Sequence, residues 1–234
     1  AGARWAFTNT DAANWHPLTW LSLMADVSLF GARPGPMHLV NAGMHAAAAG
    51  MFFLLLAMLP GGAGAGRKSD RSDGSDGSDG SDCGAAVLAA AFGALLWSLH
   101  PLRVESVAWV SSRKDVLSAL FCLGGLLAYL GDVRAWRGGQ ARETGWKVLD
   151  AAGFRSCSWR YGVALACFVL GYMAKPTMMV FPAFVALLEW LETGRVRWKP
   201  LALFGVVAVA FLGVTVFAQT GAITTVVAPR DRLM

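Results

Sequence analysis

The chain has 234 residues, of which 56% are hydrophobic and 15% are charged, whereas an ordinary soluble domain carries about 25% charged residues. Four stretches, 34–66, 83–102, 116–131 and 200–229, contain no Asp, Glu, Lys or Arg, and a transmembrane helix needs roughly 20 apolar residues. This pattern excludes a small soluble globular domain. The net charge of +5 comes without a basic stripe interleaved with aromatic residues, which argues against nucleic acid as a partner.

The first predicted element is a helix over residues 17–30. Pro17 suits the first position of a helix and Gly31 suits its end. The segment is too short to cross a bilayer and carries Asp26, while one face is formed by Leu18, Leu21, Ala25 and Leu29. We therefore expect a helix that lies in the outer membrane interface, with Trp15 at the depth of the headgroups.

Six membrane spans are predicted after this helix, at 37–58, 85–101, 116–130, 158–174, 177–191 and 201–220. Only Lys175 and Pro176 separate the fourth from the fifth, so one kinked helix is an alternative. A single helix of more than 30 residues would be about 50 Å long, which exceeds one span. Two spans joined by a tight turn are therefore favoured.

These elements predict an all-α, polytopic transmembrane bundle of about six spans plus an interfacial helix. We expect residues 1–36 to form an outer loop that contains the interfacial helix, and residues 37–234 to form the bundle. Residues 68–83 hold a Ser-Asp-Gly repeat with no extended apolar segment, which is typical of a disordered linker. The repeat lacks the Glu that closes an EF-hand loop, so it does not indicate a calcium site.

The loop charges predict an orientation. Lys and Arg are more numerous on the side that holds the 68–83 linker and the 131–157 loop. The positive-inside rule therefore places this side in the cytoplasm. His16, His100 and Lys175 are then expected on the outer side of the membrane.

Polar residues within the first span form a stripe. His38, Asn41 and His45 are spaced i, i+3 and i+7, so they share one helix face. Such groups often form hydrogen bonds between membrane helices, and a substrate-binding role is the alternative. No HExxH motif or paired-cysteine spacing accompanies them, so no metal site is expected.

More polar residues are expected at the same outer face, and ionisable groups at membrane depth are functional candidates by default. Their structural alternatives are interface anchors that snorkel, for the cations, and an ion pair with Arg103 or Arg113, for Glu105. Function is favoured because separate segments bring these groups to one face: His16, His100, Glu105, Arg113, Lys114 and Lys175.

Four strings then carry a family resemblance. WHPLTW (15–20), HLVN (38–41) with His45, HPLRVESVAWVSSRKDVLS (100–118) and GYMAKPTMMVFP (171–182) closely resemble the TMTC-like family of transmembrane and tetratricopeptide-repeat proteins. The resemblance runs from about residue 4 to 219, broken by the linker and the 131–157 loop. The chain is identified as a fragment of a bacterial member.

The resemblance implies a glycosyltransferase fold of the GT-C type and a place in the cell inner membrane. Animal members are similar to protein O-mannosyltransferases, which use a polyprenyl-phosphate sugar donor. The family's first span and the Asp pair of its first outer loop are expected upstream of Ala1, and its repeat domain downstream of Met234. Where the catalytic acid belongs to that pair, this chain holds only part of the active site.

Sugar transfer from such a donor to a protein or glycan acceptor needs a proton-accepting group and cations for the phosphate. We expect Glu105 and His100 to be catalytic, Arg113, Lys114 and Lys175 to bind phosphate, and further substrate contacts from Trp15, His16, His38, His45 and Trp109. A continuous helix would place Glu105, Trp109 and Arg113 on one face. No cofactor is expected. The alternative is a non-catalytic membrane anchor of a repeat-containing scaffold protein.

Overall fold

The computed structural model describes residues 2–8, 15–59, 79–138 and 158–227. Within these ranges every regular element is a helix and there is no strand. The elements are, in chain order, α1 (Gly2–Thr8), α2 (Pro17–Phe30), α3 (Pro34–Met58), α4 (Asp79–Ser98), α5 (Pro101–Ala108), η2 (Val110–Ser112), α6 (Arg113–Arg137), α7 (Trp159–Ala174), η5 (Pro176–Val180), α8 (Phe181–Thr193) and α9 (Trp198–Val227). The all-α class is confirmed.

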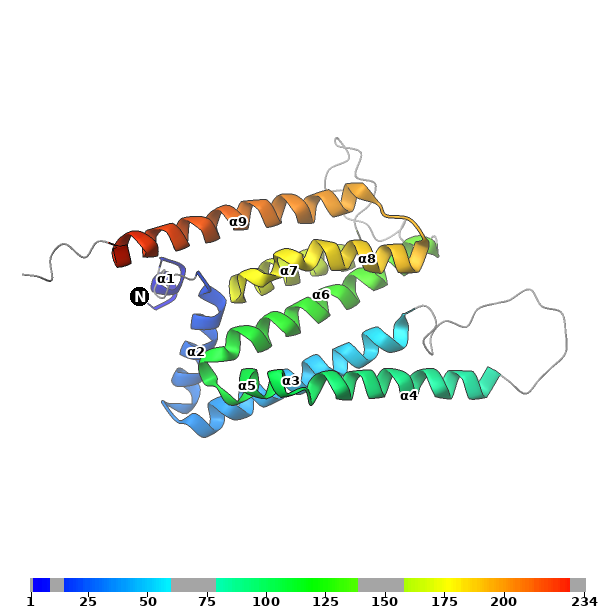
Figure 1. Cartoon of the computed structure of the whole chain (residues 1–234), viewed down its shortest axis with the longest axis horizontal. Coiled ribbons are helices and arrows are strands. Elements are labelled where there is room, and N and C mark those ends of the chain that lie inside the picture. Colours follow the sequence, from blue (N-terminus) through cyan, green and yellow to red (C-terminus); the bar gives the residue numbers. More distant parts are fainter. Residues whose placement is uncertain (1, 9–14, 60–78, 139–157, 228–234) are drawn as a thin grey trace, which may run out of the picture.

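The long helices lie side by side along the long axis of the molecule (Figure 1). Helices α3, α4, α6, α7, α8 and α9 run in alternating directions, and α2 lies across one end of them, beside α1. Helix α6 lies at the centre of the bundle. In its most apolar stretch 56% of the residues are buried, whereas the corresponding stretches of α3 and α9 are each 17% buried. Helices α3 and α9 are therefore open to the surroundings of the protein along much of their length.

In the part of the chain that the structure describes, three helices, in α3, α6 and α9, are long and apolar enough to cross a membrane. The bent pair Gly84–Ser98 and Pro101–Ala108, with a bend of 57°, would make a fourth. Helices α7 and α8, of 16 and 13 residues, are shorter than a typical span. The structure thus supports an apolar helical bundle suited to a membrane, while six spans and a GT-C arrangement stay predictions.

The break between α7 and α8 is confirmed. Lys175 is extended, with φ −153° and ψ 129°, because a residue that precedes proline is disfavoured in the α region. The chain then makes the short helix η5 and turns back into α8, so that Phe181 stacks on Phe168 with ring centroids 5.2 Å apart.

Helix α2 has the predicted bounds, and the structure shows which side faces the bundle. Thr19 and Asp26 are buried, whereas Leu29 is 73% exposed. The Thr19 hydroxyl donates a hydrogen bond to the carbonyl of Ala174 at 3.2 Å. The polar side is therefore turned inward, and apolar side chains stay available for a membrane interface.

The helix boundaries differ from the predicted segments in two places. Helix α6 begins at Arg113 and continues to Arg137, well beyond the expected span 116–130, because Asp132 and Arg134 find buried partners in Ser158 and Glu192. Residues 131–137 of the expected 131–157 loop are therefore helical, and residues 139–157 lie outside the described residues. Most of the predicted 68–83 linker also lies outside them, although α4 already begins at Asp79.

The expected continuous helix through residues 105–113 is also absent. Helix α5 ends at Ala108, Trp109 is extended with φ −94° and ψ 116°, and η2 leads into α6. Glu105, Trp109 and Arg113 therefore do not share one helix face.

Candidate functional site

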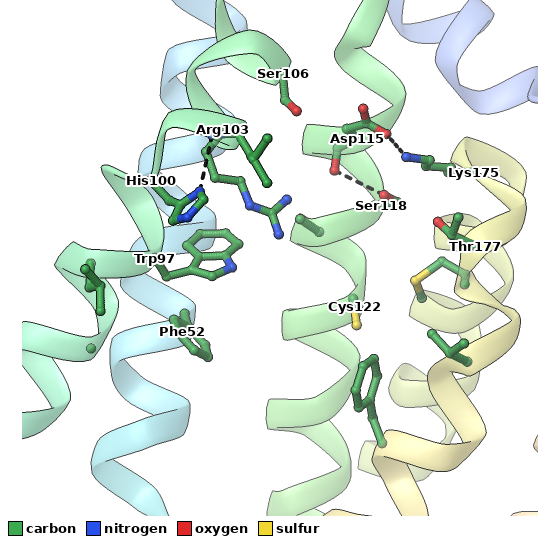
Figure 2. Close-up of a pocket in the computed structure, with 17 residues that line it drawn as sticks. Phe52, Trp97, His100, Arg103, Ser106, Asp115, Ser118, Cys122, Lys175 and Thr177 are labelled. Carbon is green, nitrogen blue, oxygen red and sulfur yellow. Dashed lines mark hydrogen bonds and ion pairs between the residues drawn. The ribbon is translucent and has the colours of Figure 1, made fainter.

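A cavity of about 790 Å³ opens between α4 and α5 on one side and α6, η5 and α8 on the other. It lies toward the end of the bundle where α5 meets α6 (Figures 1 and 2). The polar residues that line it are His100, Arg103, Ser106, Asp115, Ser118, Lys175 and Thr177. Two of the predicted site residues, His100 and Lys175, are therefore brought together.

Arg103 is presented to this cavity by an aromatic ring. Its guanidinium carbon lies 4.6 Å from the centroid of Trp97, at the distance of a cation–π contact. Trp97 is held in turn by stacking on His45, with centroids 5.6 Å apart. Arg103 forms no ion pair with any of the described residues, and Figure 2 shows its guanidinium directed into the space between α4 and α6. It is a cation without a carboxylate partner there.

Lys175 lies across the cavity and forms an ion pair with Asp115 (Figure 2). The two side chains are 32% and 22% exposed, respectively. The extended backbone before Pro176 carries Lys175 to this position. Asp115 lies in the first turn of α6, where the helix dipole favours a negative charge. The cavity thus holds two cations and one carboxylate.

His100 caps α5. Its Nδ1 accepts a hydrogen bond from the backbone N–H of Leu102 at 3.3 Å, so in the neutral imidazole the proton is assigned to Nε2. His100 is exposed, and its Nε2 is free to donate a hydrogen bond to an anionic or sugar oxygen. In this tautomer Nε2 already carries the proton, so it cannot act as a base.

An apolar groove is continuous with the cavity. This second space, of about 350 Å³, shares Phe52, Trp97, Arg103, Ala119, Cys122 and Phe184 with the cavity. It is otherwise lined by Leu55, Leu59, Leu123, Leu126, Leu187, Leu188 and Leu191. Arg103, which lines both spaces, therefore lies where the polar cavity meets a groove that can take a long apolar chain.

Arg113, predicted to bind phosphate, lies elsewhere. Its side chain is completely buried and pairs with Asp26. Its Nε donates to Asn41 Oδ1 at 2.7 Å, and its guanidinium also donates to the carbonyl of Met37 at 3.0 Å. These partners belong to α2 and α3, so Arg113 joins three helices and does not line the cavity.

Three other residues predicted to bind substrate lie near the start of α2: Trp15, His16 and Lys114. Trp15 Nε1 donates to the carbonyl of Phe7 at 3.0 Å, and His16 stacks on Trp20 with centroids 5.3 Å apart. Burial, and then the charge of Lys114, lower the pKa of His16. Lys114 is half-buried. None of these residues lines the cavity or the groove.

The polar stripe of α3 splits into separate environments. The Asn41 amide donates to the carbonyl of Val107 at 3.4 Å, and His45 Nε2 lies 3.1 Å from the carbonyl of Ser98. These are contacts between helices, which the first of the two sequence interpretations expects. His38 is exposed, as are Glu105 and Trp109, and none of the three lines the cavity. Among the described residues, no group of three or more His, Cys, Asp or Glu could hold a metal ion.

Sequence reasoning did not single out Trp97, Arg103 or Asp115. The six-residue separation of Trp97 and Arg103 is not a same-face spacing on a helix, and they meet because the chain bends between α4 and α5. Asp115 gave a usable signal, since it follows two adjacent cations at the start of an apolar run.

No family model matches the chain and no solved structure matches it. The chain is similar to human (Homo sapiens) protein O-mannosyl-transferase TMTC4, with 31% identity over 131 residues, which cover 56% of this chain and 16% of that protein. It is also similar to human protein O-mannosyl-transferase TMTC2, with 30% identity over 133 residues, which cover 57% of this chain and 13% of that protein. The chain thus spans a small part of the curated relatives it matches, and a distant TMTC-like relationship is supported.

Proposed function

We propose that this chain forms part of a membrane glycosyltransferase that transfers a sugar, mannose in the first instance, from a polyprenyl-phosphate donor to a hydroxyl group of a protein. One observation carries the proposal: Arg103 and Lys175 line one polar cavity, and Arg103 also lines the apolar groove that is continuous with it. The similar human proteins are named protein O-mannosyl-transferases, which supports the class of reaction.

The donor has a charged head and an apolar tail, and the site offers both environments. Arg103 can grip phosphate oxygens with two N–H groups, while Lys175 acts as a compact point charge. His100 Nε2 would donate to a phosphate or sugar oxygen. The isoprenoid chain would lie in the leucine-lined groove, where it would remove apolar surface from water.

The proton of the acceptor hydroxyl must pass to a base as the new glycosidic bond forms. Glu105 is exposed on α5, outside the donor cavity, and we propose it for an acceptor that approaches from the water. A carboxylate upstream of Ala1 is the alternative that the family resemblance suggests. The positive-inside rule favours the end with α2 and α5 as the outer face, so transfer would occur at the outer side of a cell inner membrane.

Transfer in membranes that contain the full-length protein tests this function. Radiolabelled mannosyl phosphoryl polyprenol would be supplied and label on protein hydroxyls measured. We expect Arg103→Gln and Lys175→Gln each to lower transfer by about tenfold or more, since each removes a charge-assisted phosphate contact. Arg33→Gln is the matched control, because Arg33 is exposed and its side chain caps no helix.

The competing function is a non-catalytic membrane anchor for a scaffold protein. An anchor has no use for a cation such as Arg103, which has no carboxylate partner among the described residues, beside an apolar groove. Absence of transfer from the wild-type protein with polyprenyl-linked sugars would favour the anchor and refute the enzyme. Unchanged transfer by Arg103→Gln would remove Arg103 from the donor site.

A further inference from the structure

Asp115 is unusual among the carboxylates of the described residues, because it alone lines the cavity. Its partner is Lys175, one of the two cations assigned to the donor phosphate. The short Asp115 side chain cannot follow that cation far, because the Asp115 backbone belongs to the first turn of α6. There its backbone carbonyl accepts a hydrogen bond from Ser118 Oγ at 3.1 Å. Lys175 therefore has a fixed carboxylate in the place where an incoming anion would bind.

We propose that Asp115 is an internal counter-ion, which pairs with Lys175 while the cavity is empty and yields it to the phosphate of an entering lipid. This inference rests on the proposed function. The flexible Lys175 stem lets its ammonium group move between the carboxylate and a phosphate by a change of rotamer. Arg103 differs, since its guanidinium stays on Trp97 and has no carboxylate among the described residues to leave.

The charge balance explains why such a counter-ion is useful. Two unpaired cations in a partly buried cavity are costly, and Asp115 offsets one of them. The lipid phosphate must then displace Asp115, which lowers its apparent affinity. The same competition assists departure of the spent lipid phosphate, because Asp115 recaptures Lys175. Asp115 is thus a positioning residue that acts on the donor through Lys175.

Binding of a sugar-free polyprenyl phosphate to the full-length protein in detergent tests the proposal. Asp115→Asn removes the carboxylate that competes for Lys175. It is expected to tighten binding by about tenfold, because the apparent affinity is reduced by the fraction of Lys175 that the carboxylate holds. Asp115→Glu keeps the carboxylate and is expected to bind like the wild type. Lys175→Met is expected to weaken binding. Because Asp115 acts through this lysine, adding Asp115→Asn to Lys175→Met should change the affinity less than twofold, within the scatter of independent sites.

Arg195→Gln is the control for a change of one charge, since Arg195 is exposed and lines neither the cavity nor the groove. Its affinity for the probe should equal that of the wild type. Unchanged or weakened binding by Asp115→Asn would overturn the proposal, as would equal tightening with and without Lys175, or a wild type that does not bind the probe.

The two proposals can fail separately. The expected affinity pattern without any sugar transfer by the wild type would refute the enzyme and leave the counter-ion standing. Sugar transfer without the affinity pattern would refute the counter-ion alone. Where transfer is measured, Asp115→Asn should lower the KM for the donor while kcat does not rise, because tighter product binding slows release. A purely structural tether would not lower that KM.

Discussion

Arg113 of α6 and Asp26 of α2 form a buried ion pair, in which the arginine side chain is 0% exposed and the aspartate side chain is 8% exposed. The pair fastens the helix that lies across the end of the bundle to its central helix (Figure 1). Asn41 of α3 completes the arrangement by accepting from Arg113 Nε. One guanidinium group of α6 thus joins the consecutive helices α2 and α3 to a helix that is distant in the sequence.

Arg113→Met should destabilise the protein by about 3–5 kcal/mol, because it leaves the buried Asp26 charge without its partner. Arg113→Lys should cost less, since it keeps the charge but loses the fork that reaches both Asn41 and Asp26. Thermal unfolding in detergent measures both, with Arg33→Met as the exposed control. Normal unfolding of Arg113→Met together with lost binding of a lipid phosphate would restore Arg113 to the phosphate site that the sequence predicts.

Local patterns predicted the helices well where local chemistry decides them. Helix α2 begins at Pro17 and ends before Gly31 as expected, and Pro176 separates α7 from α8. The end of α6 could not be predicted this way. Its last turns carry Asp132 and Arg134, which resemble loop residues until Ser158 and Glu192 are known to be their partners.

The site was predicted less completely, because its geometry depends on a bend and on long-range pairing. His100 and Lys175 were named from the sequence and do meet at the cavity. Spacing alone placed Arg113 beside Glu105, since nothing local reveals the extended residue Trp109 between them. The partner of Arg113 in α2 is equally invisible to any periodicity argument.

Gly125→Ala should destabilise the bundle, whereas Gly124→Ala should not. A Cβ atom at Gly125 would lie 2.9 Å from the ring of the fully buried Phe181 and 3.2 Å from Cys167 Cβ. At Gly124 the nearest atom would be 3.8 Å away, which is an ordinary contact. Overpacking of this kind costs about 1–3 kcal/mol, while alanine is otherwise the better helix former. Equal melting temperatures of the two variants in detergent would contradict the close approach of α6 and α8.

His16 should make stability depend on pH. Burial and the nearby Lys114 lower its pKa in the folded protein, so the unfolded chain takes up the proton first as the pH falls below about 6.5. Stability should therefore decrease from that pH until the lowered folded pKa is passed, and then level off. Thermal unfolding between neutral and acidic pH measures the slope. His16→Gln should reduce this slope, while His38→Gln, at an exposed histidine, should leave it unchanged; an identical slope in both variants would exclude His16.

Arg197 and Arg195 give the sharpest comparison at the other end of the bundle. Arg197 pairs with Glu189, which is 0% exposed and also accepts from the Tyr129 hydroxyl at 2.9 Å. Arg197 reaches Asp132 at 3.4 Å as well. Arg195, two residues away, is exposed, and the hydrogen bonds that join it to Thr193 use its backbone.

Arg197→Met should therefore cost about 3–5 kcal/mol, because it leaves a buried carboxylate with a single neutral donor. Arg195→Met should cost less than about 0.5 kcal/mol, as surface substitutions usually do. The double variant Arg197→Met with Glu189→Leu should recover part of the loss, since it removes the stranded charge as well as its partner. Thermal unfolding in detergent measures all three. Equal melting temperatures of Arg197→Met and Arg195→Met would contradict this prediction. The buried carboxylate of Glu189 would then not need Arg197 as its partner.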